Sequence, residues 1–295
     1  MKILLTGADG QIGRALQRID TSHQLIALDR TQLDITDPIA CTQILNTYHP
    51  DWIINTAAYT AVDAAEKEVE KAYAVNCDGV STLARSAQPL HIPILHLSTD
   101  YVFSGTAAIP YREEDPICPE GVYAKSKAEG ESRLRALHPE HLILRVSWVF
   151  DSMSQNFIKT IAQLTQTREI LNVVEDQMGS PTYAPDIASI LFTLIEKTSK
   201  APDVWGTYHY TGQPAMTRHQ IAHEILKVCQ AMGTTRTRAL YPVKSSQFPT
   251  LAPRPAYSVL DTRKITRVFG IVPSDWRNYL RDVIKIALRE QRVPV

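Results

Sequence analysis

Short apolar runs alternate with longer amphipathic stretches through the first half of the chain. Five runs have the length of buried strands, and they cover residues 2–6, 24–28, 52–55, 93–97 and 141–146. Between them, apolar residues recur at helical spacing, which predicts helices over 38–48, 62–87 and 123–137. Strands that alternate with helices are typical of a parallel sheet covered on both faces. We therefore expect an α/β fold with a Rossmann-like, doubly wound parallel sheet.

The alternation is less regular in the second half of the chain. The pattern predicts helices over 156–166, 183–198, 218–232 and 275–292, and strands over 170–174 and 207–210. We expect a dinucleotide-binding domain over 1–150, with returns to it near 170–198 and 235–265. Residues 151–295 are then mainly a smaller, interleaved substrate-binding lobe.

Three glycines mark the exit from the first predicted strand. In this position Gly7 allows a tight turn, Gly10 lets a pyrophosphate approach the following helix, and Gly13 lets helix and strand pack closely. The spacing differs from the commoner Gly-x-Gly-x-x-Gly, and a turn without a ligand remains the alternative. Asp29, at the end of the second strand, favours the cofactor-binding interpretation.

The residues after the second strand bear on the choice of cofactor. Asp29 suits the ribose 2′-hydroxyl of NADH, whereas Arg30 beside it could accept the 2′-phosphate of NADPH. Both residue types are also common in turns. We expect NADPH or NADH to bind.

Candidate catalytic groups follow the fourth strand and open the next long helix. Thr99 and Asp100 lie at a strand end, where ligands bind in open parallel sheets, although such residues also cap turns. Tyr123 and Lys127 are four residues apart and share a helix face. An ammonium near a phenol lowers the tyrosine pKa, which predicts that Tyr123 can donate a proton. The Tyr-x-x-x-Lys spacing also occurs by chance on helix surfaces.

Asn76 lies within the helical stretch 62–87. A buried asparagine must find hydrogen-bond partners, and we expect it to bind backbone near the next strand.

Composition excludes several classes of function. Lysine plus arginine equals aspartate plus glutamate, at 31 each, so no basic surface indicates nucleic acid. No apolar run is long enough to span a bilayer, and Met1 leads directly into a strand, so we expect a cytoplasmic protein.

The four cysteines are far apart, and His219 and His223 lack the glutamate of a His-Glu-x-x-His motif. No metal site is expected.

Several motifs together resemble the extended short-chain dehydrogenase/reductases, and among them the reductases of 4-keto-6-deoxy sugar nucleotides. The resemblance covers nearly the whole chain and rests on Thr6-Gly7-x-x-Gly10-x-x-Gly13, residues 55–63, 74–76 and 98–105, Tyr123-x-x-x-Lys127, residues 145–150, Asn156-Phe157, residues 176–182, Arg254-Pro255 and residues 260–262. It implies that Thr99, Tyr123 and Lys127 are catalytic. The resemblance and the positions described above together give the expected cofactor contacts, which are Gly7, Gly10, Gln11, Ile12, Gly13, Asp29, Arg30, Asp34, Ile35, Ala57, Ala58, Tyr59, Asn76, Tyr123 and Lys127.

The same resemblance implies reduction of the C4 keto group of dTDP-4-dehydro-6-deoxy-L-mannose to dTDP-L-rhamnose, with hydride from the nicotinamide and a proton from Tyr123. The expected sugar-nucleotide contacts are Thr99, Asp100, Trp148, Asn156 and Arg254. Trp148 offers an apolar surface to the sugar's methyl group, or is a core residue. Arg254 pairs with the diphosphate or with a loop carboxylate.

Two departures from the family pattern concern a metal and the oligomeric state. Acidic side chains that bind magnesium at a dimer interface in some members correspond here to Ala15 and Pro185, which cannot ligate a cation. We therefore expect no such metal, and a monomer or a homodimer.

Other functions remain open at this point. A dehydratase of this family would have a glutamate at position 101, which is Tyr101 here. A non-catalytic subunit that resembles the regulatory β-subunit of methionine adenosyltransferase and another sugar-nucleotide 4-reductase are the remaining alternatives.

Overall fold

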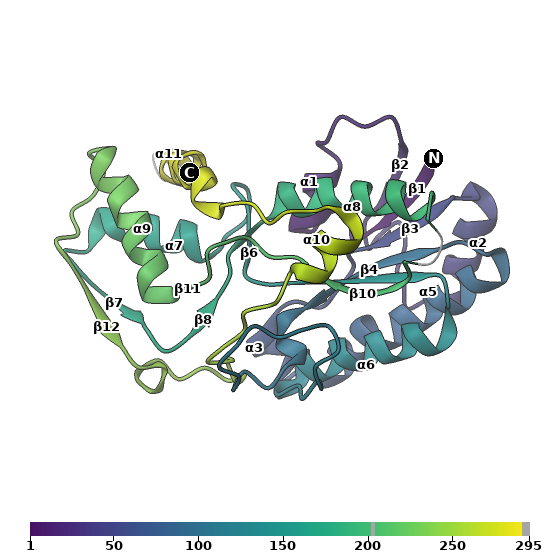
Figure 1. Cartoon of the computed structure of the whole chain (residues 1–295), viewed down its shortest axis with the longest axis horizontal. Helices are drawn as coiled ribbons and strands as arrows, with labels where there is room; N and C mark the ends of the chain where they lie inside the picture. The colour runs from purple at the N-terminus through teal and green to yellow at the C-terminus, as the bar shows by residue number, and fades with distance from the viewer. Residues whose placement is uncertain (202–203, 291–295) are drawn as a thin grey trace.

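A six-stranded parallel sheet forms the centre of the larger lobe (Figure 1). The computed structural model describes residues 1–201 and 204–290. The strand order is β10-β5-β4-β3-β1-β2, which is doubly wound as predicted. The strands are β1 (Lys2–Thr6), β2 (Gln24–Leu28), β3 (Trp52–Asn55), β4 (Ile94–Thr99), β5 (His141–Val146) and β10 (Gly206–His209).

Helices cover both faces of this sheet (Figure 1). One face carries α1 (Gln11–Leu16), α8 (Ala184–Thr198) and α10 (Arg263–Phe269), and the other carries α2 (Pro38–Tyr48), α5 (Val80–Ala87) and α6 (Gly121–Leu137). Alternate residues of β1 serve the two faces: Ile3 and Leu5 pack in the first core, and Leu4 packs in the second. Because both faces are covered, the inner strands are buried and mostly apolar on both sides.

The stretch predicted as one helix over 62–87 is interrupted. It divides into α3 (Val62–Ala65), α4 (Val69–Tyr73), a π-helical turn η1 (Ala74–Gly79) and α5. At this turn α6 approaches so closely that a Cβ on Gly130 would lie 2.0 Å from the carbonyl oxygen of Asn76. The prediction of one continuous helix was therefore wrong, because the periodicity of the sequence does not report a bulge that packing requires.

A smaller lobe lies beside the carboxyl ends of the strands. Its helices α7 (Phe157–Thr167), α9 (Arg218–Ala231) and α11 (Leu280–Glu290) share a third core with residues of β7 (Ile170–Val174) and β12 (Ala239–Val243). Short strand pairs join β6 (Val149–Phe150) to β9 (Thr182–Tyr183), and β8 (Met178–Gly179) to β11 (Met216–Thr217). The remaining short turns are η2 (Gln88–Leu90), η3 (Asp100–Val102), η4 (Ser245–Gln247) and η5 (Trp276–Tyr279).

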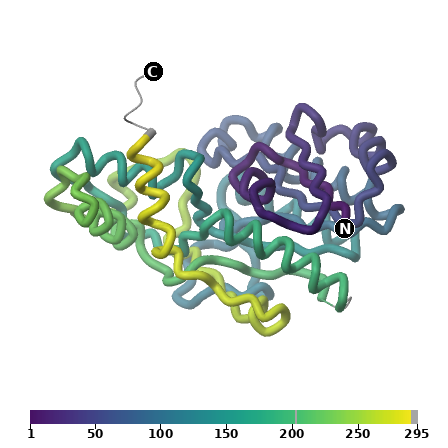
Figure 2. The backbone as a smooth tube through the Cα atoms, turned by 90° about the horizontal axis from the view of Figure 1, so that it is seen from above, coloured from purple at the N-terminus to yellow at the C-terminus, as the bar shows by residue number. Residues whose placement is uncertain are grey.

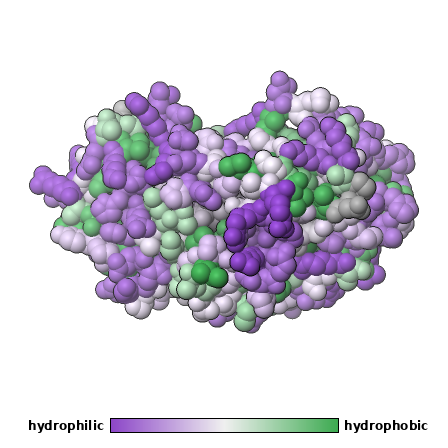
Figure 3. All heavy atoms as spheres, viewed as in Figure 1, coloured by the Kyte–Doolittle hydropathy of each residue, from purple (hydrophilic) through white to green (hydrophobic). Residues whose placement is uncertain are grey.

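The chain crosses between the two lobes more than once (Figure 2). Between two segments of the smaller lobe, α8 and β10 return to the larger lobe, where α8 packs beside α1. The predicted last helix begins as η5 and continues as α11, and its predicted end at 291–292 lies outside the described residues. Figure 3 shows a mostly hydrophilic face, hollowed between the lobes. Within the described residues, no helix has the length and apolarity needed to cross a membrane.

Candidate active site

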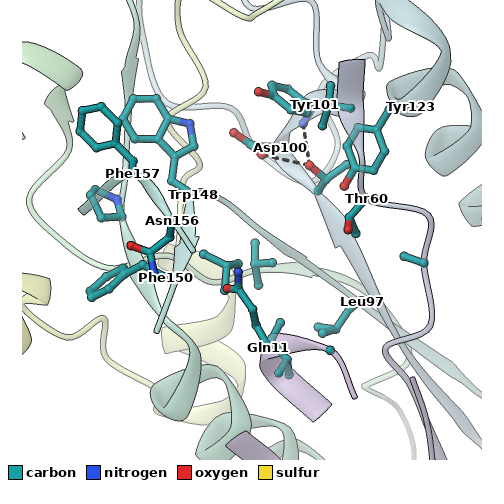
Figure 4. A pocket seen from close by; sticks show the side chains of 18 of the residues that line it. Gln11, Thr60, Leu97, Asp100, Tyr101, Tyr123, Trp148, Phe150, Asn156 and Phe157 are labelled. Carbon is teal, nitrogen blue, oxygen red and sulfur yellow. Dashed lines mark hydrogen bonds between the residues drawn. The ribbon is translucent and has the colours of Figure 1, made fainter. Parts of the chain in front are cut away.

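A cavity of about 710 Å³ lies between the carboxyl ends of the sheet strands and the smaller lobe. Figure 4 shows that Gln11, Leu97, Asp100 and Tyr123 approach it from the larger lobe. Trp148, Phe150, Asn156 and Phe157 approach it from the opposite side. The strand ends and the interface between lobes are both common positions for a ligand site.

The glycine loop forms part of the cavity floor. Gly10, Gln11 and Ile12 line the cavity, and Gln11 Oε1 is buried without a hydrogen-bond partner among the described residues. Gly7 and Gly13 lie behind them. Gly7 has φ +73°, and a Cβ on Gly13 would lie 2.3 Å from the carbonyl oxygen of Gly7. These two glycines therefore permit the loop to fold, whereas Gly10 leaves the cavity floor free of a side chain.

Thr99 and Asp100 are placed by the end of β4. The Thr99 hydroxyl donates to Asp100 Oδ1 at 3.0 Å and accepts from the Tyr101 amide at 3.2 Å. Burial raises the pKa of Asp100 to about 6, against the opposing effect of the nearby Ser258 and Thr99 hydroxyls. Asp100 Oδ2 has no hydrogen-bond partner among the described residues. This carboxyl group therefore retains an acceptor for a ligand.

Tyr123 projects from the first turn of α6 into the same cavity as Thr99. Burial raises the pKa of Tyr123 above its ordinary value, and the neighbouring Thr99 hydroxyl partly opposes this. The Tyr101 ring packs edge-on against the Tyr123 ring, with 5.8 Å between centroids. The phenol thus stays protonated at neutral pH.

The lysine of this pair does not act on the phenol as predicted. Lys127 Nζ donates to the carbonyl oxygen of Leu97 at 2.6 Å, and burial lowers the pKa of Lys127 to about 8. The prediction that the Lys127 ammonium lowers the pKa of Tyr123 was therefore wrong. Helical spacing places both side chains on one face, but the ammonium is directed to the backbone of β4 and burial of the phenol dominates.

The opposite wall is a stack of aromatic rings and one guanidinium. The Arg218 guanidinium carbon lies 4.3 Å from the centroid of the Trp148 ring and 5.0 Å from that of Phe157. Arg218 Nε donates to Gln177 Oε1 at 2.8 Å. Trp148 has φ +44°, a conformation that side chains other than glycine adopt at a cost of about 1–3 kcal/mol.

No motif in the sequence indicates that Arg218 lines the cavity. The pattern predicts the helix over 218–232, but helical spacing does not report the direction of its side chains. In the structure Thr217 caps this helix, because its hydroxyl accepts from the Gln220 amide at 3.2 Å. To predict that Arg218 lines the cavity, one would need to know that it packs against Trp148, which is distant in the sequence.

Two predicted substrate contacts line the cavity but are largely engaged within the protein. Asn156 caps α7 by accepting from the Lys159 amide at 3.1 Å, and its Nδ2 donates to backbone carbonyls in the preceding loop. Arg254 Nη2 donates to Asp63 Oδ2 at 2.6 Å, so the loop ion pair forms. Its Nη1 is buried without a partner among the described residues, which leaves a donor for a ligand.

Nine predicted cofactor contacts do not line this cavity, namely Gly7, Gly13, Asp29, Arg30, Asp34, Ile35, Ala57, Tyr59 and Asn76. Asp29 Oδ1 accepts from the amides of Thr31 and Gln32 at the end of β2, and Arg30 pairs with Asp34 at 3.5 Å. The carboxyl end of β2, where a ribose is expected to bind, therefore lies outside the cavity.

Asn76 does not bind backbone near the following strand, so that prediction was wrong. Its Oδ1 accepts from the Tyr59 amide at 2.8 Å, and its Nδ2 donates to the Tyr59 carbonyl and to Ser126 Oγ. The buried amide is therefore satisfied by the loop after β3 and by α6, because η1 turns it toward them. Asn76 positions the loop through Tyr59.

Within residues 1–201 and 204–290, no three His, Cys, Asp or Glu side chains gather where they could hold a metal ion. Ala15 is buried in the core beside α8, and Pro185 lies in the first turn of that helix.

The chain matches the family described as RmlD substrate binding domain over residues 1–289. It is 44% identical over 287 residues to a dTDP-4-dehydrorhamnose reductase of Aggregatibacter actinomycetemcomitans, covering 96% of this chain and 98% of that protein. The chain belongs to the dTDP-4-dehydrorhamnose reductase family.

Solved structures of dTDP-4-dehydrorhamnose reductases have the same fold. A reductase of Clostridium acetobutylicum superposes with a TM-score of 0.89 at 35% identity, covering 98% of this chain and all of that one. A dTDP-4-dehydrorhamnose reductase of Bacillus anthracis, solved in complex with NADP, superposes at 0.86 with 31% identity, covering 98% and 99%. The family and the Rossmann-like fold predicted from the sequence are thus confirmed.

Proposed function

We propose that this protein reduces the C4 keto group of dTDP-4-dehydro-6-deoxy-L-mannose to give dTDP-L-rhamnose, with NADPH or NADH as reductant. The observation that carries the proposal is that one cavity joins the glycine loop to Thr99 and Tyr123. A loop that admits a dinucleotide and a protonated phenol beside a hydroxyl are together the groups that a carbonyl reduction requires. The family membership supports the same reaction.

The cavity fits a nicotinamide dinucleotide. Gly10 leaves its floor open, Ala58 adds only a methyl group, and Gln11 Oε1 is an unpaired acceptor for an amide such as that of the nicotinamide. When bound, the cofactor supplies the hydride. Asp29 and Arg30 at the end of β2 are the residues that would meet its second ribose.

Tyr123 donates the proton in this proposal, and Thr99 hydrogen-bonds the same substrate oxygen. Because burial raises the pKa of Tyr123, the phenol holds its proton until negative charge develops on the oxygen at C4. The Thr99 hydroxyl, fixed by Asp100 and Tyr101, stabilises that charge. Lys127 binds cofactor or substrate hydroxyls through the hydrogens that Leu97 does not occupy.

The opposite wall binds the sugar nucleotide. Trp148 offers an apolar ring to the C6 methyl group, and Asp100 Oδ2 offers an acceptor to a sugar hydroxyl. Arg254 and Arg218 present guanidinium groups suited to the diphosphate. Asn156 holds the loop before α7 against the substrate. In this proposal residues 1–150 bind mainly the cofactor and the smaller lobe binds mainly the substrate.

Incubation of the purified protein with NADPH or NADH and dTDP-4-dehydro-6-deoxy-L-mannose tests the reaction. We expect loss of the reduced-nicotinamide absorbance and formation of dTDP-L-rhamnose, identified by its stereochemistry at C4. Binding of both ligands without turnover would overturn the proposal in favour of a non-catalytic subunit. A different epimer or a preference for another sugar nucleotide would instead indicate a related 4-reductase. We place the reaction in the cytoplasm, with the enzyme as a monomer or homodimer.

A further inference from the structure

A chain of buried polar side chains crosses the sheet from β1 to α6. The Thr6 hydroxyl donates to Asn55 Oδ1 at 2.7 Å, and Asn55 Nδ2 lies 3.1 Å from His96 Nδ1. On the other side of the ring, His96 Nε2 lies 3.3 Å from Lys127 Nζ. The exposed fraction of each of these four residues is 2% or less. Every polar atom of these four side chains must therefore find its partner within the protein.

One backbone contact determines the direction of these hydrogen bonds. The Ala57 amide, which can only donate, lies 3.1 Å from Asn55 Oδ1. Asn55 therefore presents its oxygen to Ala57 and Thr6, and its NH₂ group to His96. Because this NH₂ group donates to Nδ1, the neutral imidazole carries its proton on Nε2.

The proton on His96 Nε2 consequently faces Lys127. An ammonium has only donors, so it would oppose this N–H, whereas a neutral amine has a lone pair that accepts it. We propose that His96 is a positioning residue that favours the neutral amine of Lys127, by directing its Nε2–H at Nζ. The consequence for catalysis rests on the proposed function: a lysine that changes protonation near working pH can exchange protons during turnover, and a permanently charged lysine cannot.

Other charged groups near the pair do not remove this effect. Glu131 and Arg135 from α6 and His141 from β5 act on the pKa of His96, and burial keeps that pKa well below its ordinary value. Glu131 also raises the pKa of Lys127, but burial has the larger effect and lowers it. The Glu131 charge is neutralised in addition by Arg145, whose Nε and Nη2 donate to it at 2.9 and 2.7 Å.

Nitrogen NMR of the unmodified protein labelled with ¹⁵N-histidine tests the tautomer directly. We expect the His96 signal, identified by its loss in His96→Gln, to show a protonated Nε2 and an unprotonated Nδ1. A proton on Nδ1 would overturn the proposal. This measurement requires neither turnover nor a folded Asn55 variant.

Asn55→Asp tests the effect on Lys127. The carboxylate keeps an acceptor for Ala57 and Thr6 but presents a second acceptor to His96 Nδ1, so the ring proton moves there and Nε2 accepts from the ammonium. Because the added carboxylate charge by itself also raises the pKa of Lys127, the position of the ring proton is followed in the same variant by ¹⁵N-histidine NMR. The pKa of Lys127, followed by ¹³Cε-lysine NMR and assigned by loss of the signal in Lys127→Met, should rise by about one unit or more together with the move of the ring proton to Nδ1.

Thr6→Val is the matched control, because it removes one hydrogen bond to Asn55 but leaves the Ala57 contact that orients the amide. We expect the tautomer of His96 and the titration of Lys127 to stay unchanged in this variant. An unchanged titration in Asn55→Asp, a rise with the ring proton still on Nε2, or the same rise in both variants would refute the proposal. Since these readouts are independent of substrate, their failure is distinguishable from failure of the reductase assay.

Discussion

The two walls of the cavity are built by different interactions. On the sheet side, Thr99 and Lys127 are held by hydrogen bonds to neighbouring residues and to the β4 backbone. On the smaller-lobe side, Trp148, Phe157 and Arg218 are held mainly by stacking. Hydrogen bonds to backbone fix an atom to within a few tenths of an ångström, which suits proton transfer. Stacked rings offer broad apolar area, which suits recognition of a sugar.

Two buried carboxyl groups differ in their partners and therefore in their pKa. Glu131 accepts two hydrogen bonds from Arg145, and although burial opposes ionisation, this partner and Arg135 lower the pKa of Glu131 to about 2. Among the described residues Asp100 has no such cationic partner in contact, and burial raises its pKa to about 6. A buried acid with a full set of partners stabilises the fold, and one with a free oxygen is available to a ligand.

Tyr123→Phe is expected to have the largest effect and tests the sheet side. Removing the phenol hydroxyl should reduce kcat by about two to four orders of magnitude, because the substrate oxygen loses its proton donor. The dissociation constant for NADPH, measured by fluorescence titration, should change little. Turnover close to that of the unmodified protein would remove Tyr123 from the proposed role.

Asp100→Asn sharpens the contrast between the two carboxyl groups. The folded pKa of Asp100 lies above its ordinary value of 3.8, so the folded state binds more protons and this group costs stability as pH rises from about 4 to 6. The cost is about 3 kcal/mol, and the variant should lack it. Urea unfolding between these pH values measures the difference.

Glu131→Gln is the matched comparison for that experiment. The folded pKa of Glu131 is lowered, so its contribution is present above pH 4.5 and is lost as pH falls toward 2. The pH dependence of unfolding should therefore change in the opposite direction to that of Asp100→Asn. Changes of the same sign in both variants would contradict the contrast.

Trp148→Ala tests the stacked wall. Loss of the ring removes the surface proposed for the sugar and the partner of Arg218, so KM for the sugar nucleotide should rise about 10- to 100-fold with a smaller change in kcat. Trp205→Ala is the control, because Trp205 packs against Trp52 away from the cavity. If both variants changed KM equally, Trp148 would have no special role.

The smallest expected effect compares a helix cap in each lobe. Thr217→Ala and Asp37→Ala each remove a side chain that accepts amide hydrogen bonds at a helix N-terminus, and each should cost about 1 kcal/mol of unfolding free energy. Only Thr217→Ala should also raise KM, because α9 carries Arg218. Steady-state kinetics on both variants would show whether the two effects separate.

Local patterns in the sequence were sufficient to predict most of the elements. The strands 24–28 and 52–55 and the helix 38–48 begin and end where the structure has them, and in the structure Asp37 caps that helix. These features depend on residues close together in the chain: apolar runs form buried strands, and a capping side chain satisfies amides two or three residues away. The glycine loop was predictable for the same reason.

Only the tertiary structure decided which side chains share the cavity and in which direction they point. It turned the Lys127 ammonium to Leu97 and His96, inserted a π-helical turn at Asn76, and placed Arg218 over Trp148. The physical reason is that buried hydrogen bonds and stacked rings join residues far apart in the chain. Helical periodicity specifies the face on which a side chain lies, but its partner across the core specifies its direction and its pKa.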